Sequence, residues 1–164
     1  MVNRFIGIDP GSNGCIVAID ENNNVIGMMD LSKDYQVYWE IIADWADIEG
    51  SYDENIVTVE DVCGRPGQSC IANTTFMKLA GMAELAGYCI GEMSKVKPQT
   101  WKKHFGLIGT KDMTKTEKKH LSIELAKKLF PSVADKLTAS KDGRAEALLI
   151  ALYGKEQWQM NPSM

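Results

Sequence analysis

The sequence predicts an α/β protein in which one mixed five-stranded sheet carries helices on both faces. Three observations favour this class. Three short β-like runs open the chain, two further strand-like runs alternate with helical patterns, and only helical patterns follow them. This order places the first and fourth strands side by side, so that antiparallel and parallel pairs share one sheet.

The first three strands are expected to form an antiparallel meander. Turn-forming residues separate them, Pro-Gly-Ser-Asn-Gly at 10–14 and Glu-Asn-Asn-Asn at 21–24. The fourth run is β-branched and of the buried type, and the fifth stops before a proline. The strands are expected at Arg4–Asp9, Cys15–Asp20, Val25–Met29, Asn55–Glu60 and Glu92–Val96.

The helices are indicated by apolar residues at helical spacing and by capping signals. Thr114 and Glu117 have the spacing of a capping box, and Leu121, Leu125 and Leu129 repeat along the helix that follows. The helices are expected at Tyr35–Ile48, Thr74–Cys89, Thr100–His104, Thr114–Phe130 and Asp142–Gly154.

The composition is that of a small globular domain. The chain has 164 residues, of which 45% are hydrophobic and 24% charged, enough to bury a core. We expect one domain over residues 1–156 and a frayed tail over residues 157–164.

The four cysteines form no Cys-x-x-Cys pair and there are only two histidines, which argues against a structural zinc site. No apolar run suits a signal peptide or a membrane span, so we expect a cytoplasmic protein with reduced thiols.

The formal net charge of −4 argues at first against a nucleic-acid partner. The charges are unevenly placed, however. Residues 1–60 carry a balance of −10, whereas residues 95–128 hold ten lysines against three acids, a balance of +7. Lysines in this number bind phosphate without sequence preference, although a solvated helix face is the alternative. The lysines that we expect to contact DNA are Lys102, Lys103, Lys115, Lys118 and Lys119.

Two carboxylates close predicted strands. Asp9 ends the first strand before a glycine-containing loop, and Glu60 ends the fourth in the same way. Neighbouring strands that end in this manner bring both groups to one edge of the sheet, where ligands bind. Because side chains alternate along a strand, only one of Glu60 and Asp61 is expected at the site; Glu60 is our choice and Asp61 the alternative.

Asp142 and Glu146 add a third element, since residues at i and i+4 share one face of a helix. A helix cap and a solvated acid are the simpler interpretation of this pair alone. Converging carboxylates repel one another unless a cation neutralises them, and an all-oxygen ligand set suits Mg²⁺ or Mn²⁺. Two such ions about 4 Å apart are suited to phosphodiester hydrolysis by a metal-activated water.

Four segments resemble the RuvC family of Holliday-junction resolvases, and its phage-encoded members most of all. They occur in the order of the family and span most of the chain. They are Gly7–Gly14 at the first strand, Val59–Glu60 with Arg65–Ser69, Val96–Lys102, and Lys141–Ala151 on the last helix.

The resemblance implies an RNase H-like fold and a homodimer that cuts four-way DNA junctions. It also implies that Asp9, Glu60, Asp142 and Glu146 are catalytic residues that bind two Mg²⁺ or Mn²⁺ ions. Bacterial members typically carry two aspartates at i and i+3 on the last helix, whereas here Asp142 stands four residues before Glu146 and Gly143 stands three before it.

The loop after Glu60 is a second expected DNA contact, through Arg65, Gln68 and Ser69. Phe76 and Trp101 are candidates for stacking on exposed bases, although such residues also form cores. The Thr74–Cys89 helix, with its small residues, is a candidate dimer face, and packing on the sheet explains the same pattern.

The sequence also allows other functions. Actin-like ATPases and sugar kinases share the Asp-x-Gly-Ser opening, but they need a second phosphate loop, and this chain has none. A non-catalytic junction-binding protein of the same fold and a nuclease acting on RNA–DNA hybrids are the remaining alternatives. The expected function is a structure-selective endodeoxyribonuclease acting on four-way or otherwise branched DNA, in the host-cell cytoplasm if the chain is phage-encoded.

Overall fold

The computed structural model describes residues 4–11, 13–46, 54–64 and 66–161. Its sheet has the order β3-β2-β1-β4-β5. The β1–β2 and β2–β3 pairs are antiparallel, whereas β1–β4 and β4–β5 are parallel, which confirms the predicted mixed sheet. The strands are β1 (Arg4–Asp9), β2 (Cys15–Ile19), β3 (Val25–Asp30), β4 (Asn55–Glu60) and β5 (Glu92–Val96).

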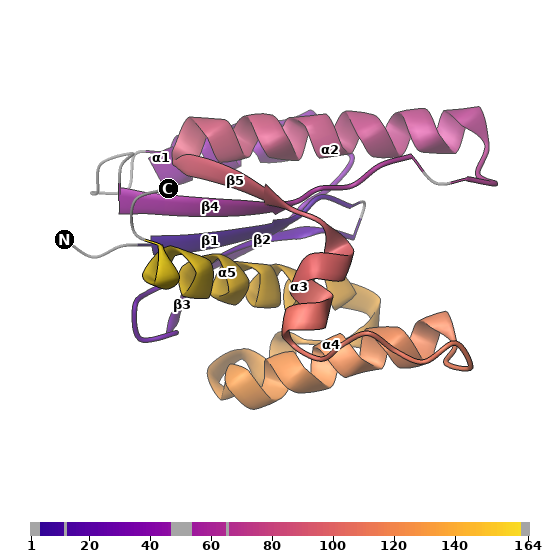
Figure 1. The fold of residues 1–164 in the computed structure, drawn as a ribbon. Helices are drawn as coiled ribbons and strands as arrows, with labels where there is room; N and C mark the ends of the chain where they lie inside the picture. The colour runs from indigo at the N-terminus through magenta and orange to yellow at the C-terminus, as the bar shows by residue number, and fades with distance from the viewer. Residues whose placement is uncertain (1–3, 12, 47–53, 65, 162–164) are drawn as a thin grey trace.

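Helices cover both faces of this sheet (Figure 1). Helices α1 (Tyr35–Ala46) and α2 (Cys70–Ile90) lie on one face. On the other face α5 (Asp142–Met160) packs on the sheet, with α3 (Pro98–His104) and α4 (Lys115–Leu129) further out. Two short 3₁₀ helices, η2 (Pro131–Lys136) and η3 (Ala139–Lys141), connect α4 to α5. Among the described residues, none of the helices has the length and apolar content that a membrane span requires.

The central strand separates two hydrophobic clusters, because alternate side chains of a strand point to opposite faces. Phe5 of β1 belongs to the cluster beneath α5, whereas Ile6 and Ile8 belong to the cluster beneath α1 and α2. Between them Gly7 lets α5 approach the sheet closely. A Cβ atom at this position would lie 2.1 Å from the carbonyl oxygen of Ala147, so a larger residue would displace the helix.

Several helix ends differ from the sequence expectations. Helix α2 begins at Cys70 rather than Thr74, because the Ser69 hydroxyl accepts a hydrogen bond from the Ala72 amide at 3.2 Å and caps it. Helix α3 begins at Pro98 rather than Thr100, since proline suits the first turn. The predicted end of the first helix, residues 47–48, lies outside the described residues.

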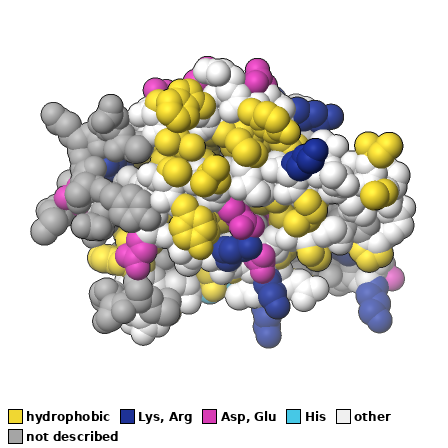
Figure 2. Space-filling view, turned by 90° about the horizontal axis from the view of Figure 1, so that it is seen from above, with side chains coloured by type: hydrophobic (Ala, Val, Ile, Leu, Met, Phe, Trp, Pro, Cys, Tyr) yellow, Lys and Arg dark blue, Asp and Glu magenta, His cyan; other side chains and the backbone are white. Residues whose placement is uncertain are grey.

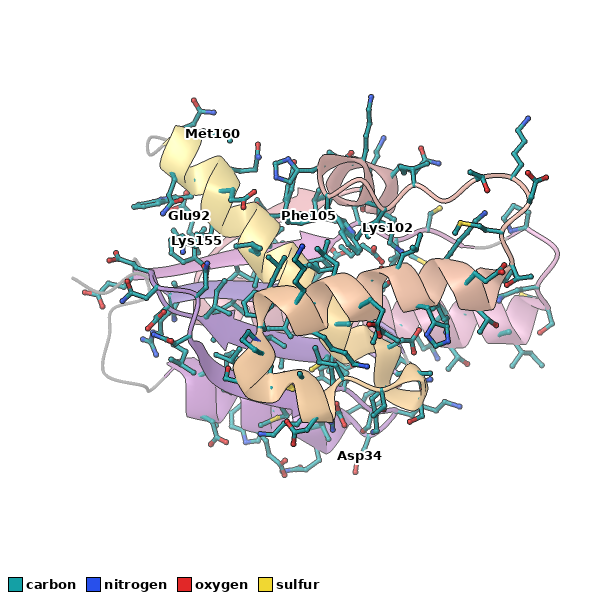
Figure 3. All side chains as sticks on the ribbon, turned by 90° about the horizontal axis from the view of Figure 1, so that it is seen from below. Asp34, Glu92, Lys102, Phe105, Lys155 and Met160 are labelled. Carbon is teal, nitrogen blue, oxygen red and sulfur yellow. The ribbon has the colours of Figure 1, made fainter. Side chains whose placement is uncertain are left out.

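Helix α5 continues beyond the expected end at Gly154. It runs to Met160 (Figure 3), so residues 157–160 are helical rather than frayed. The reason is packing: the Trp158 ring meets Phe5 of the sheet edge-on at 5.6 Å between ring centroids. Residues 162–164 of the expected tail lie outside the described residues.

Helix α4 has the capping box that the sequence predicts. The Thr114 hydroxyl accepts from the Glu117 amide at 3.2 Å, and the Glu117 carboxylate accepts from the Thr114 amide at 2.7 Å. The start of this lysine-rich helix is thereby fixed next to the loop that follows α3.

Candidate metal centre

Asp9 and Glu60 come together because β1 and β4 are parallel neighbours. Ile8 pairs with Val59 in the register of these strands, so the next residue on each strand lies at the same edge of the sheet. After Asp9 the chain reverses at once, and the Gly11 amide donates to the Asp9 carbonyl at 3.1 Å. The two strand ends therefore present adjacent carboxylates.

The first turns of α5 meet this edge through Gly143. A Cβ atom there would lie 2.1 Å from the Asn13 carbonyl oxygen and 2.9 Å from Oδ2 of Asp9. Only glycine allows this approach, which brings the start of the helix against the β1–β2 turn. The side chain of Glu146, one turn further along, is thereby directed to the strand ends.

Three of the four predicted acids form one cluster. Asp9, Glu60 and Glu146 each offer a carboxylate oxygen, and these oxygens all lie within 4.8 Å of one another. Asp142 lies beside the cluster rather than in it, because its Oδ2 atom is paired with Lys119 Nζ of α4 at 2.6 Å. Asp61, the alternative to Glu60, is paired with Lys95 Nζ at 3.0 Å.

The electrostatics of the cluster favour a cation. Burial, followed by the charges of Glu146 and Glu60, raises the pKa of Asp9 well above its usual 3.8, and the positive charge of Lys102 opposes this rise. Like charges at this distance destabilise the ionised form unless a counter-charge is added. The set contains only carboxylate oxygens, the ligands of Mg²⁺ and Mn²⁺, so these residues fit such an ion.

Lys102 is the internal counter-charge of the cluster. Its Nζ atom lies 2.9 Å from Oε1 of Glu146. Although burial of this lysine favours its neutral form, the Glu146 carboxylate raises the pKa of Lys102, so the ammonium form is retained. Figure 3, seen from below, labels Lys102, which belongs to α3.

The contact of Trp101 with the acidic cluster is one that the sequence reasoning missed. Trp101 is fully buried, so it has no surface on which a base could stack, contrary to one of the two expectations for it. Its Nε1 atom instead donates to Oε1 of Glu60 at 2.9 Å. No local pattern indicates this bond, because its partners are 41 residues apart and meet only in the folded chain.

The acidic cluster opens into a cleft of about 1150 Å³. Asp9, Glu60, Asp142 and Glu146 line one part of it, together with Phe76 and with Ile108 of the loop after α3. The lysines that line it are Lys97, Lys102, Lys115, Lys118 and Lys119. The cleft thus combines an acidic cluster with a lysine-rich wall.

The other predicted contact residues that the structure describes lie outside the lining of the cleft. Lys103 is exposed and is not among the described residues that line the cleft. Gln68 and Ser69 are also outside its lining, and the Ser69 hydroxyl is engaged as the cap of α2. Arg65 lies outside the described residues.

Comparisons with known proteins identify the fold. No family model matches the chain, and no curated protein matches it. Among solved structures, the RuvC of T. thermophilus in complex with Holliday junction substrate matches with a TM-score of 0.56 and 12% identity, over 97% of this chain and 96% of that one. A second Thermus thermophilus RuvC structure matches with a TM-score of 0.52 and 16% identity, over 96% of this chain and 97% of that one. The chain therefore has the RNase H-like α/β fold of RuvC.

Proposed function

We propose that this chain is a divalent-metal-dependent endodeoxyribonuclease that cuts four-way or otherwise branched DNA. The observation that carries the proposal is the cluster of Asp9, Glu60 and Glu146, within 4.8 Å of one another in a cleft that five lysines also line. The likeness to a RuvC solved with a Holliday junction substrate supports the choice of substrate.

In this proposal Asp9, Glu60 and Glu146 are catalytic residues that hold Mg²⁺ or Mn²⁺. Asp142 is the fourth ligand. To bind an ion, it must first break its ion pair with Lys119. Two ions in one site supply an activated water and neutralise charge on the phosphate. The i, i+4 spacing on α5 places Asp142 one turn before Glu146, on the same side of the helix.

The lysine wall has a separate role, which is to bind the DNA backbone. Lys115, Lys118 and Lys119 project from α4 into the cleft, and Lys102 projects from α3. Ammonium groups neutralise phosphates without reading sequence. We include Lys103, Gln68 and Ser69, which lie outside the cleft lining, as contacts with DNA arms that extend beyond the cleft, and Arg65 as a further DNA contact.

We further propose a homodimer that is formed through α2. The face covered by α1 and α2 carries exposed hydrophobic side chains among charged ones (Figure 2). Helix α2 contributes Leu85 and Tyr88, which are 53% and 58% exposed. On the same side of α2, a Cβ at Gly81 would meet no described atom within 4 Å outside the backbone of its own helix, so a second helix has room to approach. Leu85→Glu should convert a dimer to a monomer in sedimentation velocity; a monomeric wild type would contradict this part.

We also place this enzyme with the phage-encoded resolvases, in the cytoplasm of the host cell, because four sequence segments resemble that type. Genome context tests the placement. A gene found outside any phage or prophage would contradict it.

A panel of substrates tests the proposed activity. Purified wild type is incubated in Mg²⁺ with a synthetic four-way junction, a flap, a linear duplex and an RNA–DNA hybrid of matched sequence. We expect cleavage of the junction in preference to the linear duplex. Preference for the hybrid would replace the resolvase by an RNase H-type activity, and binding of the junction without cleavage of any substrate would identify a non-catalytic binding protein.

A further inference from the structure

Trp101 is a buried residue whose one polar atom is directed at the acidic cluster. Its exposure is 0%, and it belongs to the hydrophobic cluster beneath α5. The indole Nε1 donates to Oε1 of Glu60 at 2.9 Å, and Glu60 is itself only 6% exposed. An indole N–H is a donor and never an acceptor, so this contact favours Glu60 as a carboxylate.

We propose that Trp101 is the positioning residue for Glu60, holding its carboxylate at the place where the proposed function requires a metal ligand. A glutamate side chain has several rotatable bonds, and its neighbours Asp9 and Glu146 repel it. A hydrogen bond from a rigid, fully packed indole restricts it to one orientation. Bonds of this type, with an ionised acceptor, are roughly twice as strong as bonds between neutral groups.

The next residue on α3 contacts the same site in a different way. Lys102 Nζ lies 2.9 Å from Oε1 of Glu146 and 4.9 Å from the centroid of the Trp101 ring. A divalent ion competes with the Lys102 ammonium group, because both cations are attracted by the same carboxylates. The neutral indole carries no charge that the ion repels, so its bond to Glu60 persists when an ion binds.

The backbone keeps α3 in place for this role. The helix follows β5 directly, and the Asp61 amide after β4 donates to the Val96 carbonyl of β5 at 2.7 Å. At the other end, the Leu107 amide donates to the Lys102 carbonyl at 2.7 Å and closes the helix. Trp101 is therefore carried on an element that is fixed at both ends, as a positioning residue requires.

The test compares Trp101→Phe with Trp45→Phe. Phenylalanine keeps most of the buried ring but removes the N–H. Trp45 is the matched buried indole: it belongs to α1, is 7% exposed, and packs in the hydrophobic cluster on the opposite face of the sheet. Mn²⁺ affinity is measured without DNA, from the electron paramagnetic resonance signal of the free ion. We expect Trp101→Phe to weaken Mn²⁺ binding about 10- to 100-fold, the usual effect of losing a group that orients a ligand, and Trp45→Phe to leave it unchanged.

Equal Mn²⁺ affinity in wild type and Trp101→Phe would overturn the inference, and so would an equal loss in both variants. Absence of Mn²⁺ binding by the wild type would instead contradict the proposed function on which the inference rests. A second measurement needs no tryptophan variant to fold. In ¹⁵N NMR of the indole N–H groups, the most strongly hydrogen-bonded resonance of the wild type should persist when Mg²⁺ is added, and its chemical shift should change in Glu60→Gln. If the resonances of all four tryptophans kept their chemical shifts in Glu60→Gln, the inference would also be overturned.

Discussion

At the residue scale, the Asp9 carboxyl lies in surroundings that disfavour its charged form. Burial and the charges of Glu146 and Glu60 raise the pKa of Asp9 well above 3.8. The folded protein thus holds this proton more tightly than the unfolded chain does. Stability without metal therefore falls as the pH rises from about 3.8 through the pKa of the folded state. In the proposed function, a bound cation offsets this loss of stability.

Asp9→Asn should therefore stabilise the metal-free protein while removing its response to Mg²⁺. At pH 7 in EDTA we expect a higher melting temperature than wild type, by about 2–4 °C for each kcal/mol of repulsion removed. Added MgCl₂ should raise the melting temperature of wild type and leave that of the variant unchanged. Asp61→Asn is the control, because Asp61 lies next to Glu60 but outside the cluster. Equal Mg²⁺ stabilisation of wild type and Asp9→Asn would contradict the assignment.

At the element scale, an ion-pair group fastens the start of α5 to the edge strand β3. The Arg144 guanidinium donates through Nε and Nη2 to the two carboxylate oxygens of Asp30, at 2.7 and 2.8 Å, and Lys141 Nζ adds a third contact at 2.8 Å. Arg144 Nη1 also donates to the Lys136 carbonyl at 3.1 Å. This group fixes the helix turns that carry Asp142 and Glu146.

Asp30→Asn should destabilise the fold in a pH-dependent way. The hydrogen bonds from Arg144 lower the pKa of Asp30 to about 2. Its contribution is therefore complete above the usual value of 3.8 and is lost as the pH falls toward 2. In urea unfolding at pH 7 we expect the variant's free energy of unfolding to be about 1–3 kcal/mol lower than that of wild type. This difference should become smaller as the pH falls from 4 to 3. Glu124→Gln, which breaks an exposed pair with Lys127, should cost less than about 1 kcal/mol. A loss that is independent of pH would contradict the role of this ion pair.

The limits of sequence prediction are also visible at this scale. The periodicity of a strand is a local pattern, so the sequence predicts the ends of β4 and β5. The proximity of Asp9 and Glu60 was also predictable, because each residue ends a strand and the two strands are neighbours. The start of α2 depends on the hydroxyl of one residue, Ser69, and the sequence pattern predicts it four residues too late, at Thr74 instead of Cys70. The bonds of Trp101 to Glu60 and of Lys102 to Glu146 join residues more than 40 positions apart. They follow from how α3 and α5 pack on the sheet, which no pattern within one segment determines.

At the scale of the whole molecule, the placement of charge matters more than its sum. The net charge is −4, yet one cleft collects five lysines around the acidic cluster. Lys95 belongs to the same basic segment but lies outside the lining of the cleft, where it is paired with Asp61 and Glu84. The basic segment at 95–128 thus divides between the cleft and the outer surface. Only its cleft-lining members are suited to follow a DNA backbone toward the acids.

Charge reversal on α4 tests this division. The double variant Lys118→Glu, Lys119→Glu should weaken junction binding. It should also make the slope of the logarithm of the binding constant against the logarithm of the salt concentration less steep by about 2, because each phosphate contact contributes about 0.9 to that slope. Lys127→Glu, Lys128→Glu makes the same charge change on the same helix outside the cleft lining. Binding is measured by fluorescence anisotropy over a range of KCl in EDTA. Equal slopes in the two double variants would show that the cleft lysines are a solvated face.

The proposed function requires the Asp9 cluster to be the metal centre of a junction nuclease. Its most direct test is cleavage of an end-labelled four-way junction in Mg²⁺ by wild type and Asp9→Asn, with junction binding measured in EDTA. We expect the wild type to cut the junction in Mg²⁺ and not in EDTA. Asp9→Asn should bind it at least as tightly, because one negative charge has left the cleft, and should give no detectable cleavage. Cleavage by Asp9→Asn at the wild-type rate, or cleavage by wild type in EDTA, would contradict the assignment of this cluster as the metal centre.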